Sequence, residues 1–174
     1  MRLSPNALSP ARRMALLGML CALSVTLSFL EGLLPALPLP GARLGLSHLV
    51  TLTALSSLGL YGGFAVIGVK AGFALLRGVT AGCMSLCGGV LSVLVMYTLM
   101  RLCSRRVSLL GQSLAGAAAH NMGQLAVALL LLDGSLIHYA PWLLLLSLVT
   151  GSVTGLTAQL TVPLLRRLTG GSPL

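Results

Sequence analysis

The stretch VSLLGQSLAGAAAHNMGQLAVALLLL, residues 107–132, carries no formal charge and is long enough to cross a membrane as one helix. A hydrocarbon core about 30 Å thick requires roughly 20 apolar residues in helical conformation. The middle of this stretch nevertheless holds His120, Asn121 and Gln124. Polar side chains at membrane depth are costly unless they line a cavity or bind another helix. The cluster therefore predicts where a functional site lies.

The composition supports a membrane location for the whole chain. Its 174 residues are 56% hydrophobic and only 7% charged, and the mean hydropathy is +1.01. A soluble domain needs a largely polar surface in contact with water, and this composition has too few charged residues to provide one. We therefore predict an all-α membrane protein, with residues 1–174 forming one compact bundle of about six transmembrane helices. The predicted spans lie near 12–31, 44–58, 60–77, 83–100, 107–132 and 141–165.

The second span is short for a full crossing and contains hydroxyl residues together with His48. Such a segment is tilted, partly re-entrant or shielded by its neighbours. Before it, Pro35, Pro38 and Pro40 prevent a continuing helix and predict an extended connection. Glycine pairs such as Gly88-Gly89 indicate closely approaching helices more than flexible linkers.

The basic residues predict the orientation, because short cytoplasmic loops collect Lys and Arg. Eight of the eleven fall on one side of a six-span arrangement: Arg2, Arg12, Arg13, Arg101, Arg105, Arg106, Arg166 and Arg167. We therefore expect a multi-pass protein of the cell membrane with both termini in the cytoplasm and the Pro35–Arg43 connection outside. The net charge of +9 then needs no nucleic acid. The Arg101–Arg106 segment could also meet anionic lipid or an acidic partner.

The first predicted span has two different faces. At about 100° per residue, Ala11, Ala15, Gly18 and Ala22 form a narrow stripe of small residues, and the polar face opposite carries Ser24, Ser28 and Glu31. The polar face is expected to look into the bundle. The small residues Ala15, Gly18 and Ala22 suit docking of another membrane protein, although packing within this chain is equally compatible with the pattern.

In the fifth span, one stripe recurs every four residues through Gln112, Gly116, His120, Gln124 and Ala128. This stripe lines a ligand pocket or, alternatively, ties neighbouring helices together through hydrogen bonds. The four cysteines are expected to be inert, since no His or carboxylate accompanies Cys83 and Cys87. No cofactor and no metal are expected. In the last span, Gly151 and Gly155 are expected to serve packing.

Several of these motifs carry a family resemblance along nearly the whole chain. They are Glu31 before the proline-rich segment, Pro40-Gly41-Ala-Arg-Leu-Gly-Leu-Ser-His48, Gly88-Gly89-Val-Leu-Ser92, Ala119-His120-Asn121-Met-Gly123-Gln124 and Thr150-Gly151-Ser-Val-Thr-Gly155. This order resembles the Gx transporter family, also labelled heptaprenyl diphosphate synthase component I. That family in turn is similar to the substrate-binding S components of energy-coupling factor transporters. Where the family typically has Asn, this chain has His48.

The resemblance implies an S-component-like subunit for uptake of a small molecule, working with a transmembrane coupling protein and cytoplasmic ATPases. The candidate ligand-binding residues are Glu31, Arg43, His48, Lys70, Arg77, His120, Asn121 and Gln124. The alternative is a membrane accessory subunit of a heptaprenyl diphosphate synthase or quinone-related system. Either way we predict a binding subunit and no enzyme, because two acids, Glu31 and Asp133, cannot build the clustered carboxylates that hold magnesium and diphosphate.

Overall fold

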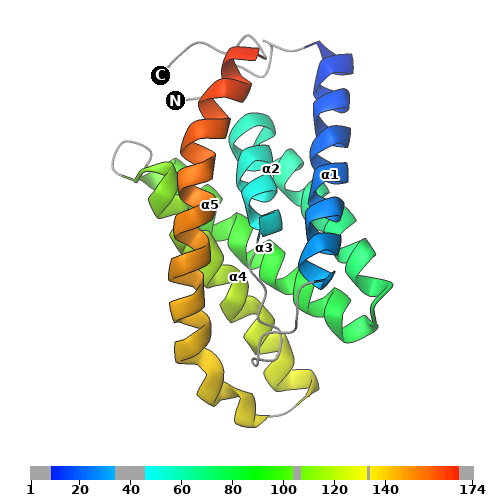
Figure 1. The fold of residues 1–174 in the computed structure, drawn as a ribbon, viewed down its shortest axis with the longest axis vertical. Coiled ribbons are helices and arrows are strands. Elements are labelled where there is room, and N and C mark those ends of the chain that lie inside the picture. Colours follow the sequence, from blue (N-terminus) through cyan, green and yellow to red (C-terminus); the bar gives the residue numbers. More distant parts are fainter. Residues whose placement is uncertain (1–8, 34–45, 104–106, 133, 169–174) are drawn as a thin grey trace.

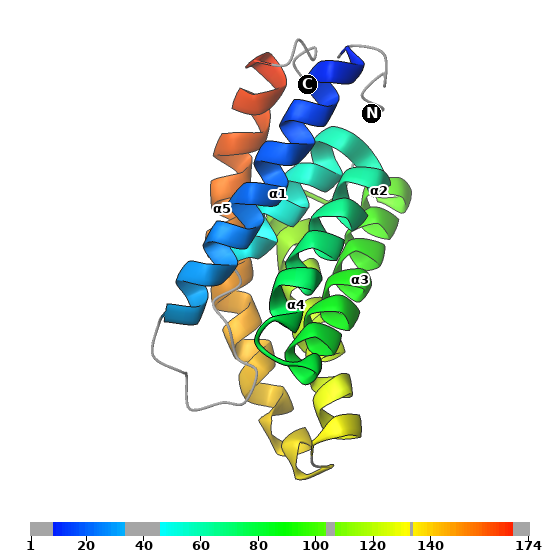
Figure 2. The ribbon, with the colours of Figure 1, turned by 90° about the vertical axis from the view of Figure 1, so that its right-hand side faces the viewer.

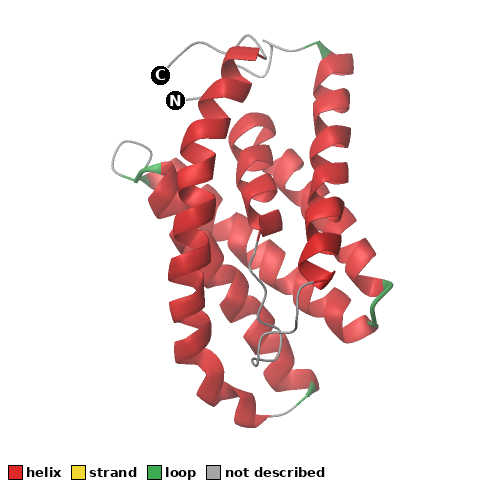
Figure 3. Ribbon diagram, viewed as in Figure 1, coloured by secondary structure: helices red, strands yellow, loops and turns green. Residues whose placement is uncertain are grey.

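A computed structural model describes residues 9–33, 46–103, 107–132 and 134–168 of the chain, without the side chains of residues 46 and 166–168. Within these ranges the protein is helical, with short connections and no strand (Figure 3). The elements are α1 (Pro10–Leu33), α2 (Leu46–Leu75), α3 (Val79–Leu102), α4 (Leu109–Leu131), the short 3₁₀-helix η1 (Gly134–Tyr139) and α5 (Ala140–Leu168). The predicted class, an all-α membrane bundle, is confirmed.

Counted as continuous elements, the described ranges hold five α-helices rather than about six. The predicted spans 44–58 and 60–77 are both part of α2, and the residue between them, Gly59, has φ 74° and ψ −162°. This backbone conformation is essentially restricted to glycine. The chain therefore bends sharply at Gly59 without leaving a connecting loop.

The bend at Gly59 folds the two halves of α2 back on each other. A Cβ atom built on Gly63 would lie 3.4 Å from the Leu55 Cδ1 atom, and one built on Gly62 would lie 3.0 Å from the Ala54 carbonyl oxygen. In a straight helix, residues eight apart are separated by about 12 Å along the axis. Figures 1 and 2 show the same reversal near the label of α2. Each half of α2 is therefore a separate rod in the bundle.

The helix ends follow from local chemistry. Ser9 precedes Pro10, the first residue of α1, and its hydroxyl accepts a hydrogen bond from the Arg12 amide at 3.4 Å. Ser108 precedes α4, and its hydroxyl accepts from the Gly111 amide at 3.2 Å. Between α2 and α3, Gly78 has φ 133° and ψ 154°, again a glycine conformation. A short turn therefore connects α2 to α3.

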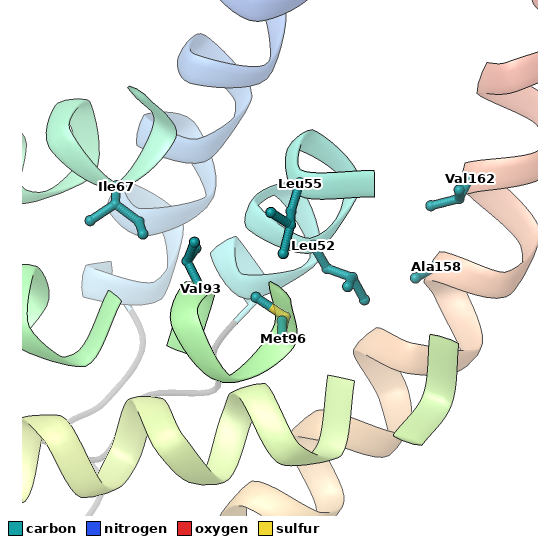
Figure 4. Packing of buried hydrophobic residues seen from close by; sticks show 7 residues of the cluster. All are labelled: Leu52, Leu55, Ile67, Val93, Met96, Ala158 and Val162. Atoms are coloured by element: carbon teal, nitrogen blue, oxygen red, sulfur yellow. The ribbon is translucent and has the colours of Figure 1, made fainter. Parts of the chain in front are cut away.

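Two apolar clusters hold the bundle together. The larger joins both halves of α2 to α3 and α5, as Figure 4 shows, and its fully buried members are Leu52, Leu55, Ile67, Val93, Met96, Ala158 and Val162. The smaller joins α1 to α2 through Leu20, Val50, Ala54 and Val66. Among the described residues, α1 packs on α2 alone, whereas α4 packs on α2, α3, η1 and α5. The helix α1 is thus peripheral and α4 central.

By length and composition, each of the five helices is large enough for a membrane span, although α2 reaches that length only as the sum of its two halves. Figures 1 and 2 place the start of α1 and the end of α5 at the same end of the molecule, with η1 at the opposite end. The first turn of α2 lies part-way along the bundle rather than at its end (Figure 1). There Ser47 and His48 are buried. The short second span is therefore shielded by its neighbours, while the Pro35–Arg43 connection falls outside the described residues.

Candidate functional site

The polar stripe of α4 faces the interior. All five of its members, Gln112, Gly116, His120, Gln124 and Ala128, are buried. The opposing surface of α3 approaches closely because both helices carry glycine at the contact. A Cβ on Gly123 would lie 2.8 Å from the Gly88 Cα, and one on Gly88 would lie 2.7 Å from the His120 carbonyl oxygen. Such contact brings the α4 side chains against the backbone of α3.

Two histidines from distant parts of the sequence meet in this interior. The rings of His48, on α2, and His120, on α4, have centroids 6.5 Å apart. The His48 Nδ1 atom lies 3.4 Å from the Ser92 hydroxyl of α3. The backbone of Ser113 also lies within hydrogen-bonding reach of the buried His48 ring. A Cβ on Gly116 would lie 2.9 Å from the His48 Cε1 atom, so this glycine makes room for the ring.

Lys70 joins the histidines because of the bend in α2. His48 and Lys70 are each eleven residues from Gly59, on opposite sides of it. Folding back at Gly59 brings equidistant residues to the same level, as it does for Leu55 and Gly63. Lys70 is 7% exposed and lies close enough to His48 for a direct electrostatic interaction. We refer to His48, Lys70, Ser92 and His120 as the interior polar cluster.

Glu31 lies beside this cluster at the start of α2. Its Oε1 atom accepts a hydrogen bond from the Ser47 amide at 3.1 Å, and the side chain is 9% exposed. The first amides of a helix have no partner within the helix, and the helix dipole favours negative charge there. Glu31 therefore caps α2 from the last turns of α1. The prediction that the Ser24, Ser28 and Glu31 face looks into the bundle is confirmed.

The two amides of α4 differ in their surroundings. The Asn121 side chain donates to the Leu143 carbonyl oxygen of α5 at 3.0 Å. Gln124 is buried against α3, where its Cγ atom would lie 2.9 Å from a Cβ on Gly88. Asn121 thus ties α4 to α5, which matches the structural alternative for this residue. His120 and Gln124 face α3 instead.

The remaining basic candidates lie apart from the interior polar cluster or beyond the described residues. Arg77 is exposed at the end of α2, with its guanidinium 5.4 Å above the Phe73 ring. A Cβ on Gly32 would lie 3.1 Å from its Nη1 atom, so Arg77 sits next to the end of α1. Arg43 falls within the segment that is not described.

The small-residue stripe of α1 faces outward. Ala15, Gly18 and Ala22 are exposed, and a Cβ on Gly18 would meet nothing within 4 Å. Packing of this stripe inside the described bundle, one of the two alternatives, is therefore wrong. By contrast, Gly151 and Gly155 of α5 do serve packing, since a Cβ on either would lie 2.9 Å from a Cα atom of α4.

Sequence reasoning did not single out the contact between His48 and Ser92, or the role of the Ser47 amide. His48 and Ser92 are far apart in the sequence, and so are Ser47 and its partner Glu31. The signal that was present is the symmetry about Gly59, which places residue 48 opposite residue 70 once the bend is known. From the sequence alone, nothing relates the position of span 44–58 to that of span 60–77.

Comparison with known proteins agrees with the motifs in the sequence. The family model described as heptaprenyl diphosphate synthase component I matches residues 20–161, which is most of the chain. The match includes every member of the interior polar cluster together with Glu31 and Ser47. No curated protein matches this chain, and no solved structure matches it either.

Proposed function

Because the chain belongs to the heptaprenyl diphosphate synthase component I family, we propose that it is a membrane accessory subunit without catalytic activity of its own. The observation that carries this proposal is the combination of a family match over residues 20–161 with only two acids in 174 residues. Prenyl diphosphate chemistry requires magnesium held by several carboxylates. A separate component of the synthase would supply them, and this subunit would hold that component at the membrane.

The end of the bundle that carries Arg101 is the proposed contact for the catalytic component. Arg101 is exposed at the end of α3. Its Nε atom donates to the Tyr97 hydroxyl at 2.7 Å, and its guanidinium lies 5.1 Å above the Tyr97 ring. A guanidinium held this way loses less freedom on binding a carboxylate than a free side chain would. An acidic surface on the partner fits this end.

Co-purification tests the proposal. The tagged chain is extracted from native membranes in mild detergent, and incorporation of labelled isopentenyl diphosphate into prenyl diphosphates is measured. We expect activity to co-purify with the chain, to fall with Arg101→Glu and to persist with Arg101→Lys, which keeps the charge. The purified chain alone should be inactive. Recovery of a membrane coupling protein and ATPases without synthase activity would contradict the proposal.

A second candidate function is uptake of a small molecule as an S-component-like binding subunit for a coupling protein and ATPases. The interior polar cluster supports it, since buried polar side chains in a membrane bundle commonly mark a ligand path. This function requires uptake that stops when the associated ATPases are inactivated. Ligand binding without such uptake supports the accessory subunit instead.

The orientation proposed for either function places the Arg101 end and both termini in the cytoplasm. In a background where the four native cysteines are replaced, a thiol is introduced at Ser9 or at Ile137, which is 50% exposed on η1. An impermeant thiol reagent applied to intact cells should label the Ile137→Cys protein and leave the Ser9→Cys protein unlabelled until the cells are opened. The reverse pattern would contradict the orientation.

A further inference from the structure

The interior polar cluster brings two imidazoles and one ammonium group together inside the bundle. The rings of His48 and His120 have centroids 6.5 Å apart, and both side chains are buried. Lys70 is close enough to His48 for a direct electrostatic interaction. The imidazole is the side chain whose ordinary titration falls between about pH 5 and pH 8. The charge inside this part of the bundle can therefore change under mild conditions.

The other elements around His48 bring one opposite charge. From α1 comes the Glu31 carboxylate, which caps the start of α2. His120 comes from α4 and Lys70 from the second half of α2. The contact from α3 is the uncharged Ser92 hydroxyl, and the described side chains of α5 include no ionisable group. With both imidazoles neutral, the described charges are thus one positive and one negative, and any added proton leaves a positive charge without a counter-charge.

Such an uncompensated charge is costly inside a membrane bundle. Water lowers the cost, because a high dielectric constant weakens the repulsion between like charges. Protonation of His48 or His120 therefore favours an arrangement that admits water. The closed arrangement is favoured at neutral pH, and it loses stability as the pH falls through the range in which exposed imidazoles accept protons.

The start of α2 is the part that can move away. Close backbone contact fixes α4 to α3, since a Cβ on Gly123 would lie 2.8 Å from the Gly88 Cα. A hydrogen bond of 2.7 Å between the Ser113 and Thr154 hydroxyls fixes α4 to α5. By contrast, His48 belongs to the first turn of α2, and the bond from its Nδ1 atom to α3 is 3.4 Å long. A long hydrogen bond of this kind is weak.

We propose that His48 and His120 form a pH-sensitive switch, in which their protonation below about pH 6.5 releases the start of α2 from α4 and admits water to the interior polar cluster. Lys70 strengthens the response, because its charge repels each proton that the imidazoles take up. The switch belongs to the bundle itself and does not depend on which partner the chain serves.

The size of the response follows from proton linkage. One linked proton changes an opening equilibrium by up to about tenfold for each pH unit. An imidazole exposed by opening accepts its proton near about pH 6.5. Between about pH 7.5 and about pH 5.5, the opened fraction should therefore rise at least about tenfold.

The three histidines of the chain provide matched variants. His48→Asn and His120→Asn should each lower the rise on acidification, and the double variant should remove it. Asparagine keeps a hydrogen-bonding amide close to the position of Nδ1 and carries no charge in this pH range. His138→Asn is the control, because His138 is exposed on η1. That variant should keep the full rise.

Thiol reactivity of the purified chain in detergent measures the opening. In a background without the four native cysteines, Ser47→Cys reports on the start of α2, and Ser85→Cys on α3 is the matched control. Both serines are buried, and their hydroxyls have no hydrogen-bond partner in the described part of the chain, so neither substitution removes a bond. Each rate is divided by the rate of the same variant unfolded at the same pH, which removes the pH dependence of the thiol itself. Ser47→Cys should show the rise, and Ser85→Cys should change less than about twofold.

Four results would overturn the proposal. They are unchanged reactivity of Ser47→Cys on acidification, an equal rise for Ser85→Cys, a rise that persists in the double histidine variant, and loss of the rise with His138→Asn. The first two results need no histidine variant, so the test stays decisive even if His48→Asn or His120→Asn does not fold. Because the measurement uses the chain alone, its outcome is independent of whether synthase activity co-purifies.

Discussion

The helices α1 and α4 both bury their polar residues, but they place their small residues differently, outward in α1 and inward in α4. In α4 the small residues meet neighbours, since a Cβ on Gly123 would lie 2.8 Å from the Gly88 Cα. In α1 they meet no neighbour in the described part of the chain, where a Cβ on Gly18 has nothing within 4 Å. The number of neighbouring helices makes the difference, because α4 is central and α1 packs on α2 alone among the described elements. A glycine in a membrane helix is therefore informative only with its neighbours known.

The buried hydroxyl side chains of α1 and α4 also differ, in whether they have hydrogen-bond partners. Ser113 of α4 and Thr154 of α5 are joined by a hydrogen bond of 2.7 Å between their hydroxyls. Ser24 and Ser28 of α1 are just as buried, yet their hydroxyls have no partner within the described chain. The α4–α5 contact is thus specified by directed bonds, whereas the α1–α2 contact depends on apolar packing and on the Glu31 cap.

The largest effect is expected for Gly123→Leu. The new side chain would meet the Gly88 Cα and the Cys87 carbonyl oxygen, and backbone cannot move aside as a flexible side chain can. Overpacking of this kind costs about 3 kcal/mol or more. Thermal unfolding in detergent and size-exclusion chromatography should show an unstable or unfolded protein.

The matched control for Gly123→Leu is Gly72→Leu in α2. Gly72 is exposed, and a Cβ there meets nothing within 4 Å. The control should unfold within about 0.5 kcal/mol of the original chain, as surface substitutions usually do. Equal stability of Gly123→Leu and Gly72→Leu would refute the close packing of α3 on α4.

A smaller loss is expected for Gly59→Ala, which tests the bend that brings His48 to Lys70. Alanine at φ 74° and ψ −162° is strained by about 1–3 kcal/mol. The midpoint of unfolding should fall accordingly, and a spectroscopic distance between labels on the two halves of α2 should lengthen. Unchanged stability together with an unchanged distance would show that the bend does not depend on glycine. Gly68→Ala, in the same helix with open space around it, is the control.

Much of the fold could be predicted from the sequence, because the length of apolar runs is set by the membrane itself. The predicted spans 12–31, 83–100 and 107–132 each lie within or close to one helix. The difference concerns spans 44–58 and 60–77, which meet at Gly59 and form one bent element without a connecting loop. A positive φ at Gly59 leaves no trace in hydropathy, so two apolar runs beside a glycine predict two helices as readily as one bent helix.

The candidate site was predictable in part. The interior position of His120, Asn121 and Gln124 followed from helical spacing. Their different partners did not, because Asn121 bonds the Leu143 backbone while His120 faces His48, and neither contact is local in sequence. Likewise, the pairing of Glu31 with the Ser47 amide spans a connection whose sequence says nothing of where it leads.

Asn121→Ala tests whether α4 is tied to α5 by directed bonds. The substitution removes the hydrogen bond to the Leu143 carbonyl oxygen, which should cost about 1 kcal/mol. Binding of a small molecule to the interior polar cluster should change less than twofold, since Asn121 points to α5 and not to that cluster. A tenfold loss of binding at unchanged stability would assign Asn121 to the ligand site. Gln124→Ala, which changes the α3 side of α4, serves as the comparison.

The smallest effect on stability, and the most specific on assembly, is expected for Gly18→Leu. Nothing among the described residues opposes the new side chain, because a Cβ at this position has open space around it. The free energy of unfolding should therefore stay within about 0.5 kcal/mol. Close approach of a partner helix to Ala15, Gly18 and Ala22 should nevertheless be blocked, since small residues are what allow such an approach.

The measurement is the yield of co-purified partner per folded chain, with Gly68→Leu as control. Gly68 is also exposed, with open space around its Cβ position, but it lies on α2 and outside the α1 stripe. Loss of partner with Gly18→Leu alone would assign the outward face of α1 to assembly. Equal partner yields for both variants would mean that this face contacts lipid, and that an exposed run of small residues carries no information about partners. The contrast with α4 would then rest on packing within the chain alone.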